Sequence, residues 1–259
     1  MTADYIFLMS EIISPVALIV NCLLLLVYFC RPLKINTSKY FVPITAVQNI
    51  IHSLTVLISV PRAVPWNYCW VMVSSGLITS WSLDLFLVEL FLLNYWLSVL
   101  TTANSFFHKF LQICKPKYFF LYSSSRGFLL ISAVNVLIVI NWCSFLYFAI
   151  WPTAKITKHL WSAILEMSGI DLNTTAFVGF CVRPQIEWYL LLIIVDSMLT
   201  LPLMATLGIY WALQINSTLK ESSFSSQTKV MQRRMNNLMI YQTVSLFYYS
   251  IHRHLCNLL

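Results

Sequence analysis

The fold is decided by residues 81–117, which read WSLDLFLVELFLLNYWLSVLTTANSFFHKFLQICKPK. The apolar part of this stretch, residues 81–107, exceeds the roughly 20 residues that a helix needs to cross the hydrocarbon core of a membrane. Basic residues follow at Lys109, Lys115 and Lys117. Positive charge after a span is typical of the cytoplasmic side. The stretch therefore predicts a transmembrane helix that ends in the cytoplasm.

The same pattern recurs on both sides of this stretch. We predict six transmembrane helices, at about residues 5–30, 41–60, 81–107, 128–151, 187–213 and 235–251. The loops after the first, third and fifth of these helices hold three, four and four of the sixteen Lys and Arg residues. This alternation places the amino terminus outside and makes the long connection 152–186 extracellular. The predicted fold class is an all-α membrane protein, a polytopic helical bundle with six visible spans.

Composition agrees with a membrane protein. Hydrophobic residues make up 59% of the 259 residues and charged residues only 10%, and the mean hydropathy is +0.77. These values exclude an ordinary soluble domain. The formal net charge of +7 is explained by the basic loops, so we predict no binding of nucleic acid.

Two outer features can be read from single residue types. Of the seven cysteines, only Cys69 and Cys181 both fall in predicted outer segments. An oxidising exterior would allow them to pair, and pairing requires their Cα atoms to lie within about 7 Å. Of three Asn-x-Ser/Thr sequences, only that at Asn173 lies in a predicted outer loop. Asn173 is therefore the candidate for glycosylation.

Ionisable side chains inside spans are expensive and by default indicate function. His52 lies in the second span, Asp84 and Glu89 in the third, and Asp196 in the fifth. One interpretation puts His52 or Glu89 in a ligand pocket; the other puts Asp84 in interfacial water and pairs His52 with a backbone carbonyl. The candidate pocket residues are His52, Glu89, Tyr95 and Trp96.

Two asparagines in neighbouring spans have a structural interpretation. Asn21 lies in the first span and Asn49 in the second. Amide side chains in a membrane commonly form hydrogen bonds between helices. We predict such a bond here.

Three further stretches carry a resemblance to a known family. They are NSFFHKFLQICKP at residues 104–116, GIDLNTTAFVG at residues 169–179, and the inner-loop series Ser226 to Lys229, Gln232, Leu238 and Gln242-Thr243. In their order along the chain, they resemble the Str family of nematode chemoreceptors, which are serpentine receptors of the G-protein-coupled type. The resemblance implies a receptor in the plasma membrane of a sensory cilium, with membrane lipid, a small external ligand and a heterotrimeric G protein as partners. The sequence contains no His-rich metal motif, no Gly-x-Ser-x-Gly and no paired carboxylates on one helical face, so we predict no enzyme activity, catalytic residue, metal or cofactor.

The family resemblance suggests which residues face the G protein. The candidates are the basic residues of the second and third predicted inner loops, Lys109, Lys115, Lys117, Lys229, Arg233 and Arg234. The other interpretation is that these charges serve only topology and attraction to anionic lipid.

The chain also departs from the family pattern. Lys109 stands where the family usually has Arg, and Leu246 stands where it usually has Pro. The sixth predicted span is about 25 Å long, against a bilayer core of roughly 30 Å, and no seventh follows in this sequence. We therefore expect a truncated or degenerate copy.

The rival class is a small transporter or channel. Transporters often contain two related halves with interrupted helices at corresponding positions. The sequence contains no such repeat, and its intramembrane charges are single rather than arranged as a relay. The receptor interpretation is therefore preferred over the transporter.

Overall fold

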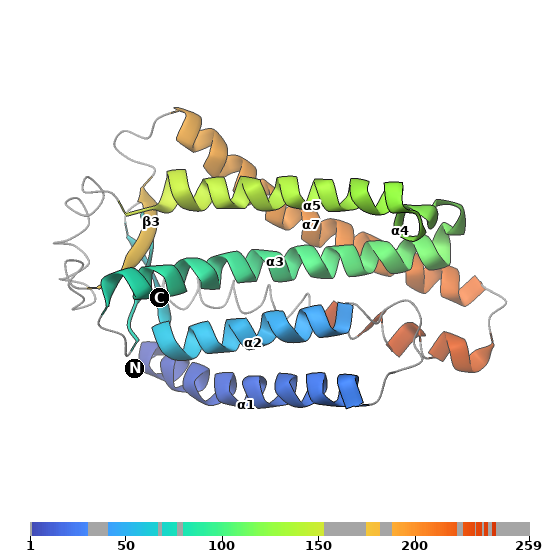
Figure 1. Ribbon diagram of the computed structural model, residues 1–259, viewed down its shortest axis with the longest axis horizontal. Helices are drawn as coiled ribbons and strands as arrows, with labels where there is room; N and C mark the ends of the chain where they lie inside the picture. Colours follow the sequence, from blue (N-terminus) through green and yellow to red (C-terminus); the bar gives the residue numbers. More distant parts are fainter. Residues whose placement is uncertain are drawn as a thin grey trace. The chain divides into compact units, whose positions relative to one another are not determined.

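The computed structural model describes residues 2–30, 41–66, 69–76, 80–152, 175–181, 188–221, 225–230, 232–234, 236–237 and 240–241 (Figure 1). Five of the described helices are long and apolar enough to cross a membrane. They are α1 (Thr2–Cys30), α2 (Phe41–Ser59), α3 (Trp81–Cys114), α5 (Ser125–Phe145) with its continuation, and α7 (Trp188–Glu221). A π-helical turn, η2 (Leu146–Ile150), continues α5.

The first five predicted spans each fall on one of these helices. Most of the sixth, 235–251, lies outside the described residues, as does most of the connection 152–186. Helix α3 does not end at Phe107 as predicted but continues to Cys114. The segment between α3 and α5 contains a 3-10 turn, η1 (Pro116–Tyr118), and the short helix α4 (Phe120–Ser123).

The chain divides into two compact units. Unit 1 comprises the described residues within 2–95 and 142–195, and unit 2 those within 96–141 and 196–251. Helices α3, α5 and α7 contribute residues to both units.

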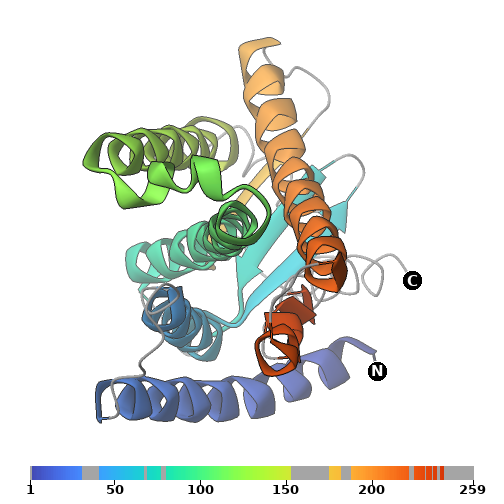
Figure 2. The same cartoon turned by 90° about the vertical axis from the view of Figure 1, so that its right-hand side faces the viewer.

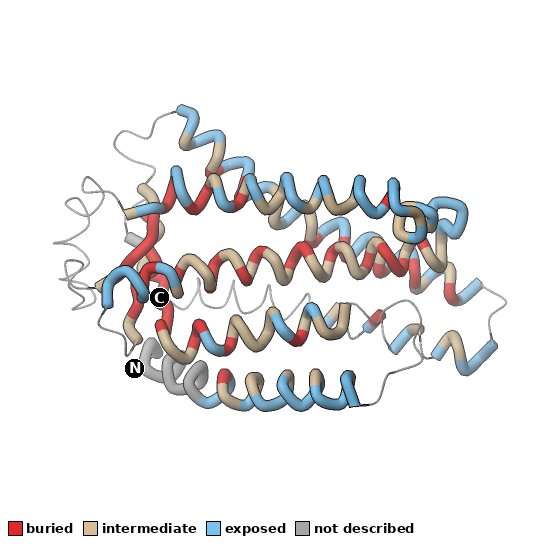
Figure 3. The backbone as a smooth tube through the Cα atoms, viewed as in Figure 1, coloured by how far each residue is buried: buried red, intermediate tan, exposed pale blue. Residues whose placement is uncertain are grey.

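In unit 1, α1 and α2 lie side by side (Figure 1). Asn49 Nδ2 donates to Asn21 Oδ1 at 3.2 Å, which confirms the predicted hydrogen bond between these helices. Asn21 Nδ2 also donates to the Ala17 carbonyl oxygen, at 2.7 Å, within its own helix. Most side chains of the window Ile12–Cys30 are exposed or half-buried (Figure 3). Their apolar character suits contact with lipid.

A three-stranded antiparallel sheet follows α2 and was not predicted. Its strands are β1 (Pro61–Trp66), β2 (Cys69–Ser74) and β3 (Phe177–Cys181), in the order β1-β2-β3 (Figure 2). The two prolines of β1 favoured a loop in the sequence analysis. Proline is tolerated in an edge strand, because the N–H that it lacks can be on the side that faces away from the neighbouring strand. The central strand β2 is almost wholly buried. Cys69, Val71, Val73 and Phe177 form its apolar core.

In unit 2, the core forms between the second half of α3 and α7. Phe106 and Ala212 are both 1% exposed and pack together with Trp211 and Ile240. A Cβ atom on Gly208 would lie 3.3 Å from Phe106 Cδ2. A larger residue at position 208 would therefore press on this core.

Candidate functional site

A polar junction in unit 1 joins α2, β2 and α3 through one serine. The Ser74 Oγ atom lies 2.8 Å from the Ser59 carbonyl oxygen and 2.5 Å from Asp84 Oδ1. Ser59, Ser74 and Asp84 are all buried. The sequence interpretation that put Asp84 in interfacial water was wrong, because the residue is only 5% exposed. The carboxyl instead ties the first turn of α3 to the end of β2.

The turn from α2 into β1 has an unusual backbone conformation. Val60 has a φ of 41°, which lies in the left-handed region that residues other than glycine rarely adopt. Two hydrogen bonds hold this turn: Ser75 N–H donates to the Ser59 carbonyl at 3.1 Å, and the Ser75 hydroxyl donates to the Val60 carbonyl at 2.8 Å. The junction thus fixes the direction in which the chain leaves α2.

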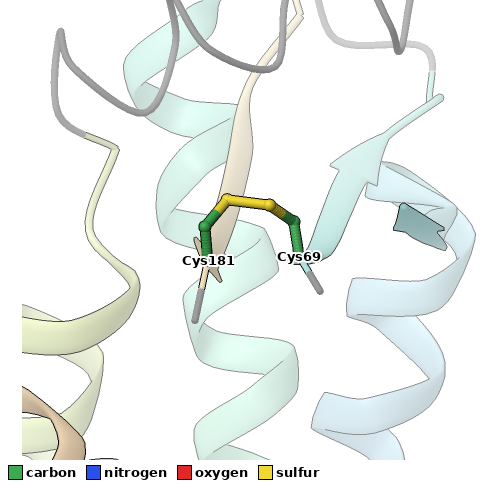
Figure 4. The surroundings of a disulfide bond; sticks show 2 residues. All are labelled: Cys69 and Cys181. Carbon is green, nitrogen blue, oxygen red and sulfur yellow. A yellow bond between two sulfur atoms is a disulfide. The ribbon is translucent and has the colours of Figure 1, made fainter. Parts of the chain in front are cut away.

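A disulfide joins Cys69 of β2 to Cys181 of β3 (Figure 4). The two residues are register partners in the sheet, with their Cα atoms 4.0 Å apart. Phe180, next to Cys181, packs 6.0 Å from the Trp70 ring and 6.2 Å from the Phe145 ring. The bond spans 112 residues of sequence, so it fastens the end of the long connection to the hairpin that precedes α3.

Three of the four predicted pocket residues lie in unit 1. His52 of α2 is half-buried and stacks on Phe91 of α3, with ring centroids 4.9 Å apart. Glu89 is half-buried, and its Oε1 atom is buried without a hydrogen-bond partner among the described residues. Tyr95 is half-buried at the end of unit 1, and Trp96 is buried as the first residue of unit 2.

Sequence reasoning missed two α3 residues that face α2. Phe91 is the stacking partner of His52, and Asn94 Nδ2 donates to the Gln48 carbonyl oxygen at 2.9 Å. Asn94 could have been found as an amide inside an apolar span, by the same rule that singled out Asn21 and Asn49. An apolar Phe91 gives no comparable sequence signal.

The basic residues predicted to face a G protein all belong to unit 2, but one of them is not at its surface. Lys109 is 4% exposed and lies within α3, which continues past it to Cys114. Its placement in an open loop was therefore wrong. Lys115 and Lys117 are exposed after the end of α3. Of the second group, Lys229 is half-buried, whereas Arg233 and Arg234 are exposed.

A polar cluster joins α3 to α5 and fastens the segment between them to α3. Asn104 and Asn135 exchange amide hydrogen bonds of 2.9 and 3.3 Å. The Tyr122 hydroxyl of α4 donates to the Asn104 carbonyl at 3.3 Å. Burial raises the pKa of the Tyr122 phenol, so its hydroxyl keeps the proton that it donates. The ring of His108 meets the Tyr122 ring edge to face, with centroids 4.8 Å apart.

Two further amide contacts join helical segments of unit 2. Asn141 Nδ2 of α5 donates to Asp196 Oδ2 of α7 at 2.6 Å. Asn236 Nδ2 donates to the Ala212 carbonyl at 3.0 Å and to Asn216 Oδ1 at 2.9 Å.

The candidate glycosylation residue Asn173 lies outside the described residues.

A family model described as serpentine type 7TM GPCR chemoreceptor Str matches residues 6–248. The chain belongs to this family. Membership confirms the resemblance to Str receptors and the predicted all-α polytopic membrane fold class. The receptor is thus a multi-pass membrane protein of a chemoreceptor family. No curated protein matches the chain.

Proposed function

We propose that this receptor binds a small external molecule and passes the signal to a heterotrimeric G protein at the plasma membrane. The observation that carries the proposal is the family match over residues 6–248. The location of its chemical groups supports it: the half-buried His52 and Glu89 belong to unit 1, and the exposed basic residues of the predicted inner loops belong to unit 2.

The proposed orientation puts the sheet of unit 1 outside the cell and the basic segments of unit 2 inside. A disulfide such as Cys69–Cys181 forms and persists in an oxidising compartment. Basic residues after α3 and α7 suit the cytoplasmic side, where short loops are enriched in Lys and Arg. The two observations are independent and favour the same orientation.

For ligand recognition, we propose His52, Glu89, Tyr95 and Trp96. Glu89 offers a buried oxygen with no hydrogen-bond donor among the described residues. A buried acceptor without a hydrogen bond is unfavourable by about 1–3 kcal/mol. A ligand that donates a hydrogen bond would remove that penalty. His52, already stacked on Phe91, would carry a change in ligand contact from α2 to α3.

For the G protein, we propose the exposed Lys115, Lys117, Arg233 and Arg234 with the half-buried Lys229 as the contact surface. Lys109, which is buried, would act through the packing of α3 rather than by direct contact. The proposed mechanism needs no catalysed reaction of the ligand. Ligand binding would favour one arrangement of the helices over another, by its difference in affinity for the two.

The test is a G-protein-dependent reporter in cells that express the receptor at their surface, with a panel of small organic molecules applied outside. A response to one compound that weakens in Glu89→Leu supports the proposal. Arg233→Gln should lower the maximal response, whereas Lys220→Gln, an exposed lysine on the last turn of α7, should leave it unchanged. Solute flux through receptor-containing vesicles, with no reporter response, would favour the transporter instead.

A further inference from the structure

One polar pair lies on the exposed side of two apolar helices and has no part in the proposed signalling function. Asp196 of α7 is exposed, and Asn141 of α5 is half-buried. Their mutual hydrogen bond of 2.6 Å is the only side-chain hydrogen bond of either residue in the described chain. A carboxyl group on such a face is costly in a membrane, so its location needs an explanation.

The depth of the pair makes solvation by water unfavourable. Asp196 lies eight residues after Trp188, the first residue of α7, or about 12 Å along the axis. Asn141 lies nine residues before Ile150, the last residue of η2, or about 13 Å. Trp188 is 75% exposed, as suits a tryptophan at a membrane interface. Both helices therefore place the pair well inside a core of roughly 30 Å.

The surface around the pair is apolar on both helices. Leu137, one turn before Asn141 on α5, is 65% exposed. Leu199 and Leu203, at the following turns after Asp196 on α7, are 62% and 60% exposed. Residues three, four or seven positions apart lie on the same side of a helix. The pair thus sits in the middle of a two-helix apolar face.

Among its unused groups the pair has one N–H donor, on Asn141, and one free carboxyl oxygen, on Asp196, and these two match each other. An asparagine amide has two N–H groups, of which Asn141 uses one. The Asp196 carboxyl has two oxygens, of which one accepts that bond. We propose that this face is an interface with a second copy of this chain, in which the spare N–H of each Asn141 donates to the spare oxygen of the other copy's Asp196.

A two-fold arrangement satisfies both copies at once. In such an interface the same patch faces itself, so each copy supplies one donor and accepts one bond. Small polar groups that bond across helices are a common source of association in membranes. The flanking leucines would pack against their counterparts. A partner that offered only donors would leave the spare N–H groups of Asn141 without acceptors.

The test measures association of the full chain in phosphatidylcholine vesicles. Two populations of purified receptor carry donor and acceptor fluorophores, and energy transfer is followed as lipid dilutes the protein. The wild type should show transfer above the level of random proximity. Asn141→Leu and Asp196→Leu should each shift the midpoint to an about tenfold higher protein-to-lipid ratio. Asp196→Asn replaces one of the two carboxyl oxygens with an amide nitrogen, which cannot accept a hydrogen bond, so it should weaken association in the same direction.

Controls separate association from folding. Asn49→Leu removes another interhelical amide bond and should leave energy transfer unchanged. Formation of the Cys69–Cys181 disulfide and the helical circular dichroism report a folded chain. If leucine at position 141 or 196 prevents folding, Leu199→Ala with Leu203→Ala tests the same face and should also weaken association. A wild type that is monomeric at every dilution, or folded variants that associate like it, would overturn the proposal.

Discussion

Removing the Ser74 hydroxyl is expected to destabilise unit 1 through Asp84. In the described chain Ser74 Oγ is the only hydrogen-bond partner of the Asp84 side chain, and Asp84 is 5% exposed. The Ser74 hydroxyl has one hydrogen, and the Ser59 carbonyl, which also lies within its reach, keeps the Ser75 N–H as a donor at 3.1 Å. Leaving one buried acceptor without a donor costs about 1–3 kcal/mol. For Ser74→Ala we therefore expect a loss of about 2 kcal/mol.

The assay is thermal unfolding of the detergent-solubilised receptor, followed by tryptophan fluorescence. For a chain of this length a loss of about 2 kcal/mol corresponds to a fall in Tm of about 4–8 °C. The control is Ser82→Ala, an exposed residue of the same first turns of α3. A surface change of this kind should stay within about 0.5 kcal/mol.

A double variant tests the reason for the effect. In Asp84→Ala the Ser74 hydroxyl still has the Ser59 carbonyl as acceptor, at 2.8 Å, and no carboxyl is left without a donor. Adding Ser74→Ala to that variant should therefore lower Tm by less than it does in the wild type, with a coupling of about 1 kcal/mol. An equal fall in both backgrounds would refute the role given to Asp84, whatever the size of the single effect.

Three other outcomes can be checked separately. Cys69→Ser should reduce the amount of receptor at the cell surface as strongly as Cys69→Ser with Cys181→Ser, because either change removes a cross-link worth typically about 2–4 kcal/mol; a milder single variant would contradict this. Tyr122→Phe should lower the free energy of unfolding by about 1 kcal/mol, because the bond to Asn104 is lost. The loss should be equal at pH 6 and pH 9, because burial raises the pKa of Tyr122 and its hydroxyl stays protonated at both. A loss that changes between these pH values would contradict this explanation. If the connection 152–186 is outside, deglycosylation should increase the gel mobility of the wild type and leave that of Asn173→Gln unchanged.

The features that follow from hydropathy could be predicted from the sequence. A membrane span depends on the summed hydropathy of about 20 residues, so it survives errors at single positions. The Asn21–Asn49 bond was predicted because an amide in an apolar helix needs a partner. No similar rule pointed to the sheet, because the strands are short and β1 contains Pro61 and Pro65. Its pairing also depends on Cys181, which lies 112 residues after Cys69.

The wrong prediction for Lys109, which placed it in a loop, also has a physical cause. The predicted end of the third span was placed where the first charge occurs, but the residues around Lys109 continue the apolar pattern, with Phe106 at 1% and Leu111 at 4% exposed. A helix continues for as long as backbone hydrogen bonds and apolar packing stabilise the next turn. A lysine can be accommodated within it, because its long apolar stem packs with the neighbouring side chains. Charge marks the side of the membrane on which a span ends, and not the residue at which the helix ends.

The intramembrane polar groups differ in a way that hydropathy does not reveal. Asn104 and Asn135 exchange two hydrogen bonds, and Asn104 also contacts the Tyr122 hydroxyl, so most of their capacity is used within the chain. Asn141 and Asp196 make one bond between them at an exposed face. Because unused donors and acceptors are unfavourable away from water, the first pair accounts for packing inside the receptor, and the second calls for a partner outside it. The number of bonds left unmade, rather than the presence of a polar residue, separates a packing contact from a docking surface.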